Sequence, residues 1–127
     1  MEKLAPDFGI RPNFWRGPTD NDYGNGQPAR SQLWKEAGQH PERCTWRVKR
    51  NGDRVVLTAV YPVGAHRYTV IYTVRPDAAV EVSATLACAP SESRMDIPRV
   101  GLRLRVPLLD GEPVPDPIRY FARGPHE

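Results

Sequence analysis

The chain has 127 residues and a formal net charge of +3, with 39% apolar and 26% charged side chains. This composition excludes a disordered chain, and no apolar run approaches the roughly 20 residues that are needed to cross a bilayer. The positive charges form no long run, so we interpret them as solvated strand faces and expect neither a nucleic-acid nor a membrane partner.

The N-terminal part of the chain is predicted to be an ordered loop followed by one short helix. Residues 1–27 combine turn residues and aromatics without a helical or strand period. Residues 28–38 are the helix candidate, because Pro28 suits a helix start and Gly38, followed by Pro41, suits a stop. Its buried side is expected to carry Leu33 and Trp34. The first ten residues lack a signal-peptide pattern, so the compartment, cytoplasmic or periplasmic, stays open.

From residue 45 to residue 123 the chain is predicted to form strands. Apolar and polar residues alternate in several segments, and one face of each is expected to be buried. Trp46 and Val48 share one side, Tyr68, Val70 and Tyr72 share one face, and Val80 and Val82 are expected to point inward. Asn51-Gly52 is expected to supply the positive φ angles of a tight hairpin turn. The 14 prolines also favour short strands, because proline breaks helix interiors. Alternation with frequent turns is typical of antiparallel sheets that have one buried and one solvated face. We therefore predict an all-β fold, an antiparallel β-sandwich or part of one; the expected strands cover residues 45–50, 53–62, 66–75, 79–88, 98–107 and 118–124.

Two cysteines, Cys44 and Cys88, have no metal-binding or redox spacing. Cys88 follows Leu86 on an expected inward face, which favours a buried thiol over a disulfide. The sequence leaves open whether the two pair.

Residues 11–26, RPNFWRGPTDNDYGNG, are the most unusual stretch of the sequence. Asp20, Asn21 and Asp22 suit a structural role, because short polar side chains bond to nearby backbone amides, although contact with a ligand or a neighbouring domain stays open. Trp15 is interpreted as a core anchor, with stacking on a sugar as the alternative. Arg16 is expected to pair with Asp20 or Asp22.

No catalytic signature is present, and "DNDYGNG" places its glycine and asparagine wrongly for a calcium loop. His126 and Glu127 resemble an acid–base pair, but neighbouring residues on a strand point in opposite directions. His40 and His66 lie in turn regions and are expected to be exposed. A glycosidase needs two carboxyl groups that face one bond, and no spacing here predicts such a pair.

Three segments together resemble a known family: RPNFWRGPTDNDYGNG, IPRVGLRLRVP and YFARGPHE. In this order they are similar to the C-terminal β-sandwich, or small-chain domain, of large bacterial β-galactosidases in glycoside hydrolase family two. The resemblance spans about residue 8 to residue 127. The family pattern continues beyond it, so we expect this chain to be the N-terminal half of that domain, truncated at Glu127.

The resemblance implies a supersandwich fold related to galactose mutarotases, and a parent enzyme that hydrolyses terminal β-D-galactosides. In the family the catalytic glutamates lie in a separate barrel domain, and Mg and Na ions are held mainly there. No catalytic residue and no metal or other cofactor is therefore expected in this chain.

We predict a non-catalytic piece of a β-galactosidase whose partners are the parent's remaining domains. It would meet the galactoside only indirectly, and a homo-oligomer is possible. The candidate substrate- or domain-interface residues are Trp15, Arg16, Asp20, Asn21, Asp22, His126 and Glu127. The alternatives are a free-standing carbohydrate-binding module, which requires Trp15 and Tyr23 to be exposed side by side, and a subunit-assembly domain.

Overall fold

The computed structural model describes residues 9–41, 44–90 and 96–105. Residues Ile10–Leu104 form one compact unit, and the second unit, Met1–Gly9 with Arg105–Glu127, lies almost wholly outside the described residues. The strand expected over 118–124 also lies outside them, so the single partial domain predicted over residues 1–127 stays a prediction. No described helix has the length and apolar character that a membrane span requires.

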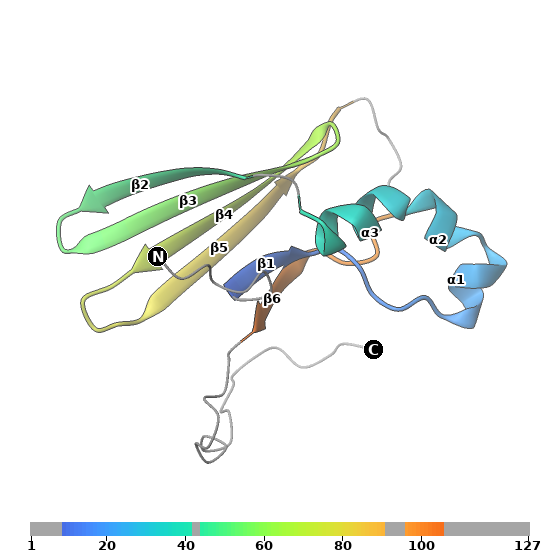
Figure 1. The fold of residues 1–127 in the computed structure, drawn as a ribbon, viewed down its shortest axis with the longest axis horizontal. Coiled ribbons are helices and arrows are strands. Elements are labelled where there is room, and N and C mark those ends of the chain that lie inside the picture. Colours follow the sequence, from blue (N-terminus) through green and yellow to red (C-terminus); the bar gives the residue numbers. More distant parts are fainter. Residues whose placement is uncertain (1–8, 42–43, 91–95, 106–127) are drawn as a thin grey trace, which may run out of the picture. The chain divides into compact units, whose positions relative to one another are not determined.

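A four-stranded antiparallel sheet forms the largest part of the compact unit (Figure 1). Its strands lie in chain order, each hydrogen-bonded to the next, so that consecutive strands are joined by hairpins. This arrangement confirms the predicted all-β, sandwich-type fold with antiparallel sheets. The four strands are β2 (Thr45–Asn51), β3 (Arg54–Val63), β4 (His66–Val74) and β5 (Val80–Ala87).

Two tight hairpins are built on glycines that have positive φ angles. Asn51 pairs with Arg54, so the first turn holds Gly52 and Asp53, and Gly52 has a φ of 62°. Asn51-Gly52 was predicted to supply positive φ at both positions, but of the two only Gly52 has it. Gly64, with a φ of 56°, has the same role between β3 and β4. Glycine adopts this conformation without the steric cost that a Cβ brings.

Register divides the sheet into two faces. Ala59 lies opposite Val70 and Tyr61 lies opposite Tyr68, and these side chains share one face with the apolar positions of the two outer strands. We call this the inner face, and the opposite one the outer face. The inner-face residues are Trp46, Val48, Arg50, Val55, Leu57, Ala59, Tyr61, Val63, His66, Tyr68, Val70, Tyr72, Val74, Val80, Val82, Ala84 and Leu86.

The segment before residue 28 is more regular than the sequence predicted. It contains a strand, β1 (Gly9–Asn13), and a capped helix, α1 (Asp20–Gly24). β1 pairs with β6 (Gly101–Arg105), more than 80 positions away in the chain, in a separate two-stranded sheet. A strand whose partner is this distant has no local signal in sequence, which is why the loop prediction for residues 1–27 is wrong here.

The predicted single helix is two helices, α2 (Gln27–Arg30) and α3 (Gln32–Gln39). Ser31 separates them, and Pro28 stands in the first turn of α2, as predicted. α3 continues through Gly38 and ends at Gln39. A Cβ at Gly38 would lie 3.2 Å from the backbone nitrogen of Phe14, so glycine lets the helix approach the end of β1 closely.

An aromatic cluster fixes α3 and the segment after β1 against one end of the inner face. Phe14 is fully buried, with its ring centroid 4.8 Å from that of Tyr68 and 5.5 Å from that of Trp34, both edge-to-face. The Tyr68 hydroxyl donates a 2.9 Å hydrogen bond to the carbonyl of Gly101, the first residue of β6, which pairs with β1. We call the region around Phe14, Trp34, Tyr61 and Tyr68 the packed end.

The other end of the inner face is open. Trp46, Val48, Val80 and Val82 are 52%, 68%, 51% and 42% exposed, although alternation predicts that they are buried. Among the described elements β1 reaches this end with Ile10, but these four side chains stay exposed. A period of two determines which face a residue is on, but it does not determine what packs against that face. We call these four residues the open end.

Three further burial predictions are wrong. His66 is buried, because it belongs to the inner face beside α3 and stacks on Trp34 with ring centroids 5.2 Å apart. Leu33 is exposed, and Trp34 alone is buried on that part of α3. Cys88 is exposed because β5 ends at Ala87, so the alternation no longer applies to it.

Candidate functional site

The predicted site segment is an ordered structural element built around the carboxylate of Asp22. Arg16 binds this carboxylate with two nitrogens, at 2.6 and 3.1 Å, which confirms the predicted pairing. Thr19 donates to the same carboxylate from its backbone nitrogen at 2.7 Å and from its hydroxyl at 2.9 Å. In return, the Asp22 nitrogen donates to the Thr19 hydroxyl, which completes a capping box at the start of α1.

These contacts decide the protonation state of Asp22. The hydrogen bond from Arg16, followed by that from the Thr19 backbone, lowers the pKa of the Asp22 carboxyl from 3.8 to about 2. A general acid of a glycosidase needs the opposite shift, toward neutral pH. Asp22 is therefore ionised at neutral pH, and its carboxylate holds the loop and the helix start together.

The neighbouring predicted residues have different environments. Asp20 and Asn21 are exposed on α1, and Tyr23 is 65% exposed. The described contacts give Asp20 and Asn21 no structural side-chain role of the kind found for Asp22. His126 and Glu127 lie outside the described residues, so the structure does not bring them to this segment or separate them from it.

Trp15 is half-buried rather than part of the aromatic cluster that its neighbour Phe14 anchors. The ammonium nitrogen of Lys35, on α3, lies 5.6 Å from the centre of the Trp15 ring, which is within the range of a cation–π contact. Lys35 thus occupies a position over the ring that a stacked sugar would need. The condition of the carbohydrate-binding alternative, Trp15 and Tyr23 both exposed, is not met.

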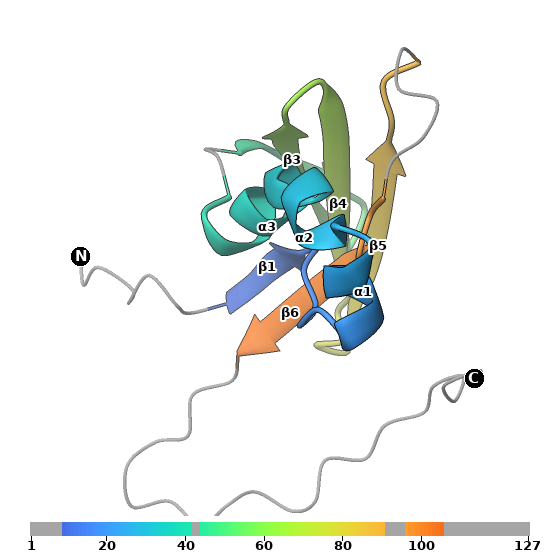
Figure 2. The same cartoon turned by 90° about the vertical axis from the view of Figure 1, so that its right-hand side faces the viewer.

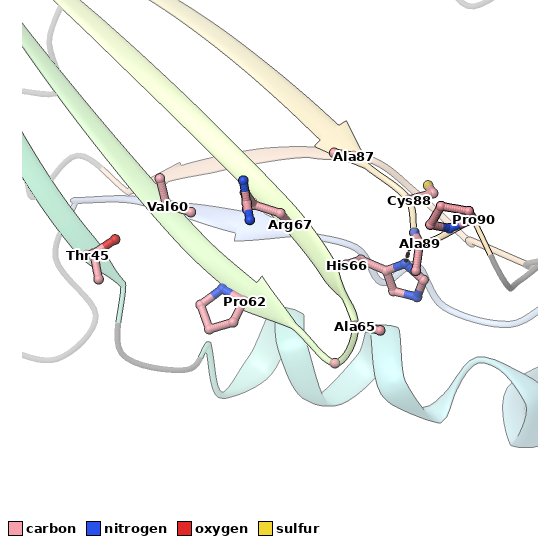
Figure 3. A pocket seen from close by; sticks show the side chains of 11 residues that line it. Thr45, Val60, Pro62, Ala65, His66, Arg67, Ala87, Cys88, Ala89 and Pro90 are labelled. Atoms are coloured by element: carbon pink, nitrogen blue, oxygen red, sulfur yellow. Dashed lines mark hydrogen bonds between the residues drawn. The ribbon is translucent and has the colours of Figure 1, made fainter.

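A second candidate site is an open hollow of 640 Å³ at the end of the sheet next to the β3–β4 hairpin (Figure 3). Its polar lining side chains are Thr45, His66, Arg67 and Cys88. The Ala89 backbone nitrogen donates a 3.0 Å hydrogen bond to Nδ1 of His66, which connects the end of β5 to β4. No carboxyl group lines the hollow among the described residues, so it lacks the paired acids of a glycosidase.

The open end of the inner face forms a third candidate, a shallow apolar cavity of 290 Å³. Trp46 stacks on Tyr72 here, with centroids 6.2 Å apart and ring planes at 20°. Exposed apolar side chains that gather on one surface mark contact sites in many proteins. The remaining lining residues are Ile10, Leu57, Val74 and Val80.

The cysteines form no disulfide, and the described residues offer no metal site. Both Cys44 and Cys88 are free thiols, which answers the question that the sequence left open. Burial, with Cys44 as a neighbour, raises the pKa of the Tyr61 hydroxyl above its usual value. Within residues 9–41, 44–90 and 96–105 no group of three or more His, Cys, Asp or Glu could hold a metal ion.

Sequence reasoning missed two features of these sites. The capping residue Thr19 has a readable signal, because threonine followed three positions later by an acid is close to the capping-box pattern. The hollow around Arg67 has no such signal, since β2, the β3–β4 hairpin and the end of β5 come together only in the folded sheet.

Comparison with known proteins gives a consistent result. The family model described as "Beta galactosidase small chain" matches residues 2–127. A β-galactosidase of Priestia megaterium (strain DSM 319 / IMG 1521) is 36% identical over 124 residues, which cover 94% of this chain and 11% of that protein. A β-galactosidase small subunit of Latilactobacillus sakei is 26% identical over 152 residues, covering 92% of this chain and 46% of that protein. The chain thus spans less than half of either relative, and no solved structure matches it.

Proposed function

Because this chain belongs to the β-galactosidase small chain family, we propose that it serves a β-galactosidase as a β-sandwich domain without catalytic acids. In this proposal the enzyme hydrolyses terminal β-D-galactosides, and its acids and any Mg or Na ions lie in other parts of the enzyme. This chain packs on those parts and helps to shape the cleft that receives the galactoside.

The observation that carries the proposal is the open end of the inner face. Trp46 and Val48 on β2 and Val80 and Val82 on β5 are exposed on this face, and Trp46 and Val80 line a 290 Å³ cavity there. Exposed apolar surface costs free energy in water, at about 25 cal/mol per Å² that burial would recover. A domain that packs against further protein recovers this free energy, whereas a module that binds sugar from solution leaves the surface wet.

Residues 11–26, which we call the opening segment, also support a role in packing rather than in catalysis. Arg16, Thr19 and Asp22 satisfy one another, and their network holds the backbone that follows the buried Phe14. Asp20, Asn21 and Tyr23 remain on the exposed side of α1. We propose that this exposed side is where the segment meets a neighbouring domain, with the Arg16–Asp22 pair setting its orientation.

An activity assay tests the non-catalytic part. The purified chain, made in a host without β-galactosidase, is assayed on a chromogenic β-galactoside beside its Asp22→Asn variant. We expect both to give the rate of buffer alone. Hydrolysis that co-purifies with the chain through a second purification step would contradict the proposal. If the Asp22→Asn variant then lacked this activity, Asp22 would be identified as a catalytic acid.

Calorimetry separates the proposal from the carbohydrate-binding module. Galactose and lactose are titrated into the chain and into Tyr23→Ala, which removes the most exposed aromatic ring of the opening segment. We expect no heat of binding from either. Saturable heat from the chain that disappears in Tyr23→Ala would establish the alternative.

A further inference from the structure

The two edge strands of the four-stranded sheet differ in charge. β2 carries Arg47, Lys49 and Arg50 and no acidic residue. β5 lies at the opposite margin of the sheet (Figures 1 and 2). Its one charged residue is Glu81. The Glu81 carboxylate already accepts a 3.1 Å hydrogen bond from Arg75, in the turn before β5. One edge is therefore strongly basic, and the other is close to neutral.

An edge strand presents unpaired backbone donors and acceptors, and natural proteins block such edges with charged side chains, lysine above all. β2 has this protection. β5 pairs only with β4 among the described strands, and it is eight residues long. Seven of its eight residues are exposed, all except Leu86. The unprotected edge is thus the one that suits addition of another strand.

We propose that β5 pairs with β5 of a second copy of this chain, antiparallel and around a two-fold axis at Ser83. The pairing joins the two sheets into one of eight strands, with both inner faces on the same side. It leaves the open end of each inner face uncovered, so the proposal is independent of the proposed function.

Charge and face together select this register. With Ser83 opposite its own copy, Glu81 lies opposite Thr85, so no like charges meet. On the inner face Val80 lies opposite Leu86, and Val82 lies opposite Ala84. A shift of the axis by one residue in either direction would leave Val80 or Leu86 without an opposite apolar neighbour. Apolar cross-strand pairs of this kind stabilise a sheet.

The same reasoning excludes β2 as the partner strand. Pairing of β2 with its own copy around its central residue, Val48, brings Arg47 opposite Lys49, and like charges directly opposite are destabilising. Pairing of β5 with β2 of another copy would bring those cations against a strand whose single acid is already bound to Arg75. It would also leave a free edge on each copy, which produces open chains rather than a closed pair.

The first test measures mass in solution by analytical ultracentrifugation from micromolar to near-millimolar concentration. We expect the chain to reach twice its 14.3 kDa. Ser83→Lys places two ammonium groups at the axis and should weaken the dimer roughly tenfold or more. Thr45→Lys adds the same charge to the outer face of β2 and should leave the dimer unchanged. Circular dichroism confirms that both variants fold.

The second test fixes the register by disulfide formation, in a Cys88→Ser background that removes the exposed native thiol. Ser83→Cys places the two Cα atoms about 5 Å apart, within disulfide range, and should form a covalent dimer on mild oxidation. Thr85→Cys lies on the same strand and face, but its copy is about 13 Å away along the strand, so it should not.

Several results would overturn the proposal. They are a chain that stays monomeric at every concentration, a dimer weakened by Thr45→Lys and not by Ser83→Lys, assemblies that grow beyond a dimer, and disulfides that form equally at positions 83 and 85. A dimer that is lost in Val48→Lys but kept in Ser83→Lys would show instead that two copies meet through their inner faces.

Discussion

The inner face of the sheet has a packed end and an open end, although both are made from the same alternation of apolar residues. At the packed end Phe14 inserts between Trp34 and Tyr68, and all three are buried. At the open end Trp46 and Val48 have equally apolar side chains and are more than half exposed. Side-chain pattern therefore determines which way a residue points, and the covering element determines whether it is buried.

This difference has a direct consequence for stability. A buried aromatic ring contributes its transfer free energy and fills volume that no neighbour can reclaim. An exposed valine in the same sheet contributes little, because it is solvated in the folded and unfolded chains alike. The exposed valines of the open end therefore add little to the stability of the isolated chain, which fits a surface that packs against another part of the enzyme.

The largest effect is expected at the packed end. Phe14→Ala should lower the free energy of unfolding by about 3–5 kcal/mol, because it leaves a cavity between α3 and the sheet. Val48→Ala, its control at the open end, should change it by less than about 0.5 kcal/mol. Urea denaturation followed by circular dichroism measures both. Similar losses in the two variants would remove the distinction between the ends.

A smaller effect tests the polar link at the packed end. Tyr68→Phe removes the hydroxyl that donates to the Gly101 carbonyl at 2.9 Å, and should cost about 1–2 kcal/mol. Tyr23→Phe makes the same chemical change on the exposed side of α1, and should stay within about 0.5 kcal/mol of the wild type. Thermal denaturation of the two variants side by side measures the difference, and a neutral Tyr68→Phe would mean that the bond contributes nothing to stability.

The pH dependence of stability tests the opening segment. Asp22 has a pKa of about 2 in the folded chain, below its ordinary 3.8, so its ionised form stabilises the fold above pH 3.8. That contribution is lost as the pH falls from about 4 toward about 2. The wild type should therefore lose stability across this window more steeply than Asp22→Asn. Asp20→Asn, on the same helix, is the control and should follow the wild type; parallel curves for all three would contradict the assignment.

The smallest effect is expected in the turn between β4 and β5. Ala78 has a φ of 63°, a left-handed conformation that a Cβ disfavours, so Ala78→Gly should raise the free energy of unfolding by about 0.5–1 kcal/mol. Ala65→Gly, in the β3–β4 turn, should lower it by a similar amount, because Ala65 has no positive φ. Chemical denaturation measures the change in the free energy of unfolding for both variants. Changes of opposite sign would support strain at Ala78, and changes of the same sign would contradict it.

Much of the sheet could be predicted from sequence. Period-two alternation placed Tyr68, Val70 and Tyr72 on one face, and the structure confirms that all three are buried. The arginine–aspartate pair in the opening segment was also predictable, because opposite charges six positions apart in a turn-rich stretch are brought close. These predictions rest on local geometry, which the sequence carries.

The failures concern contacts between distant parts of the chain. β1 escaped prediction because its partner β6 lies far along the sequence. His66 was expected in a solvated turn, but α3 packs against that turn and Trp34 covers the imidazole. Val80 and Val82 were expected to be buried, but they are exposed. The alternation of apolar residues along a strand does not show whether another element covers that face. The candidate sites depend on such contacts, so the sequence predicted their residues better than their roles.

The central claim is that the open end is covered by other parts of a β-galactosidase. The most direct measurement is the rate at which a thiol reagent labels Val48→Cys, read at that peptide by mass spectrometry, in the isolated chain and in the enzyme that contains it. Arg47→Cys, on the outer face of the same strand, is the control. We expect labelling of Val48→Cys to be fast in the isolated chain and at least roughly tenfold slower in the enzyme, as burial requires. Equally fast labelling in both would contradict the claim.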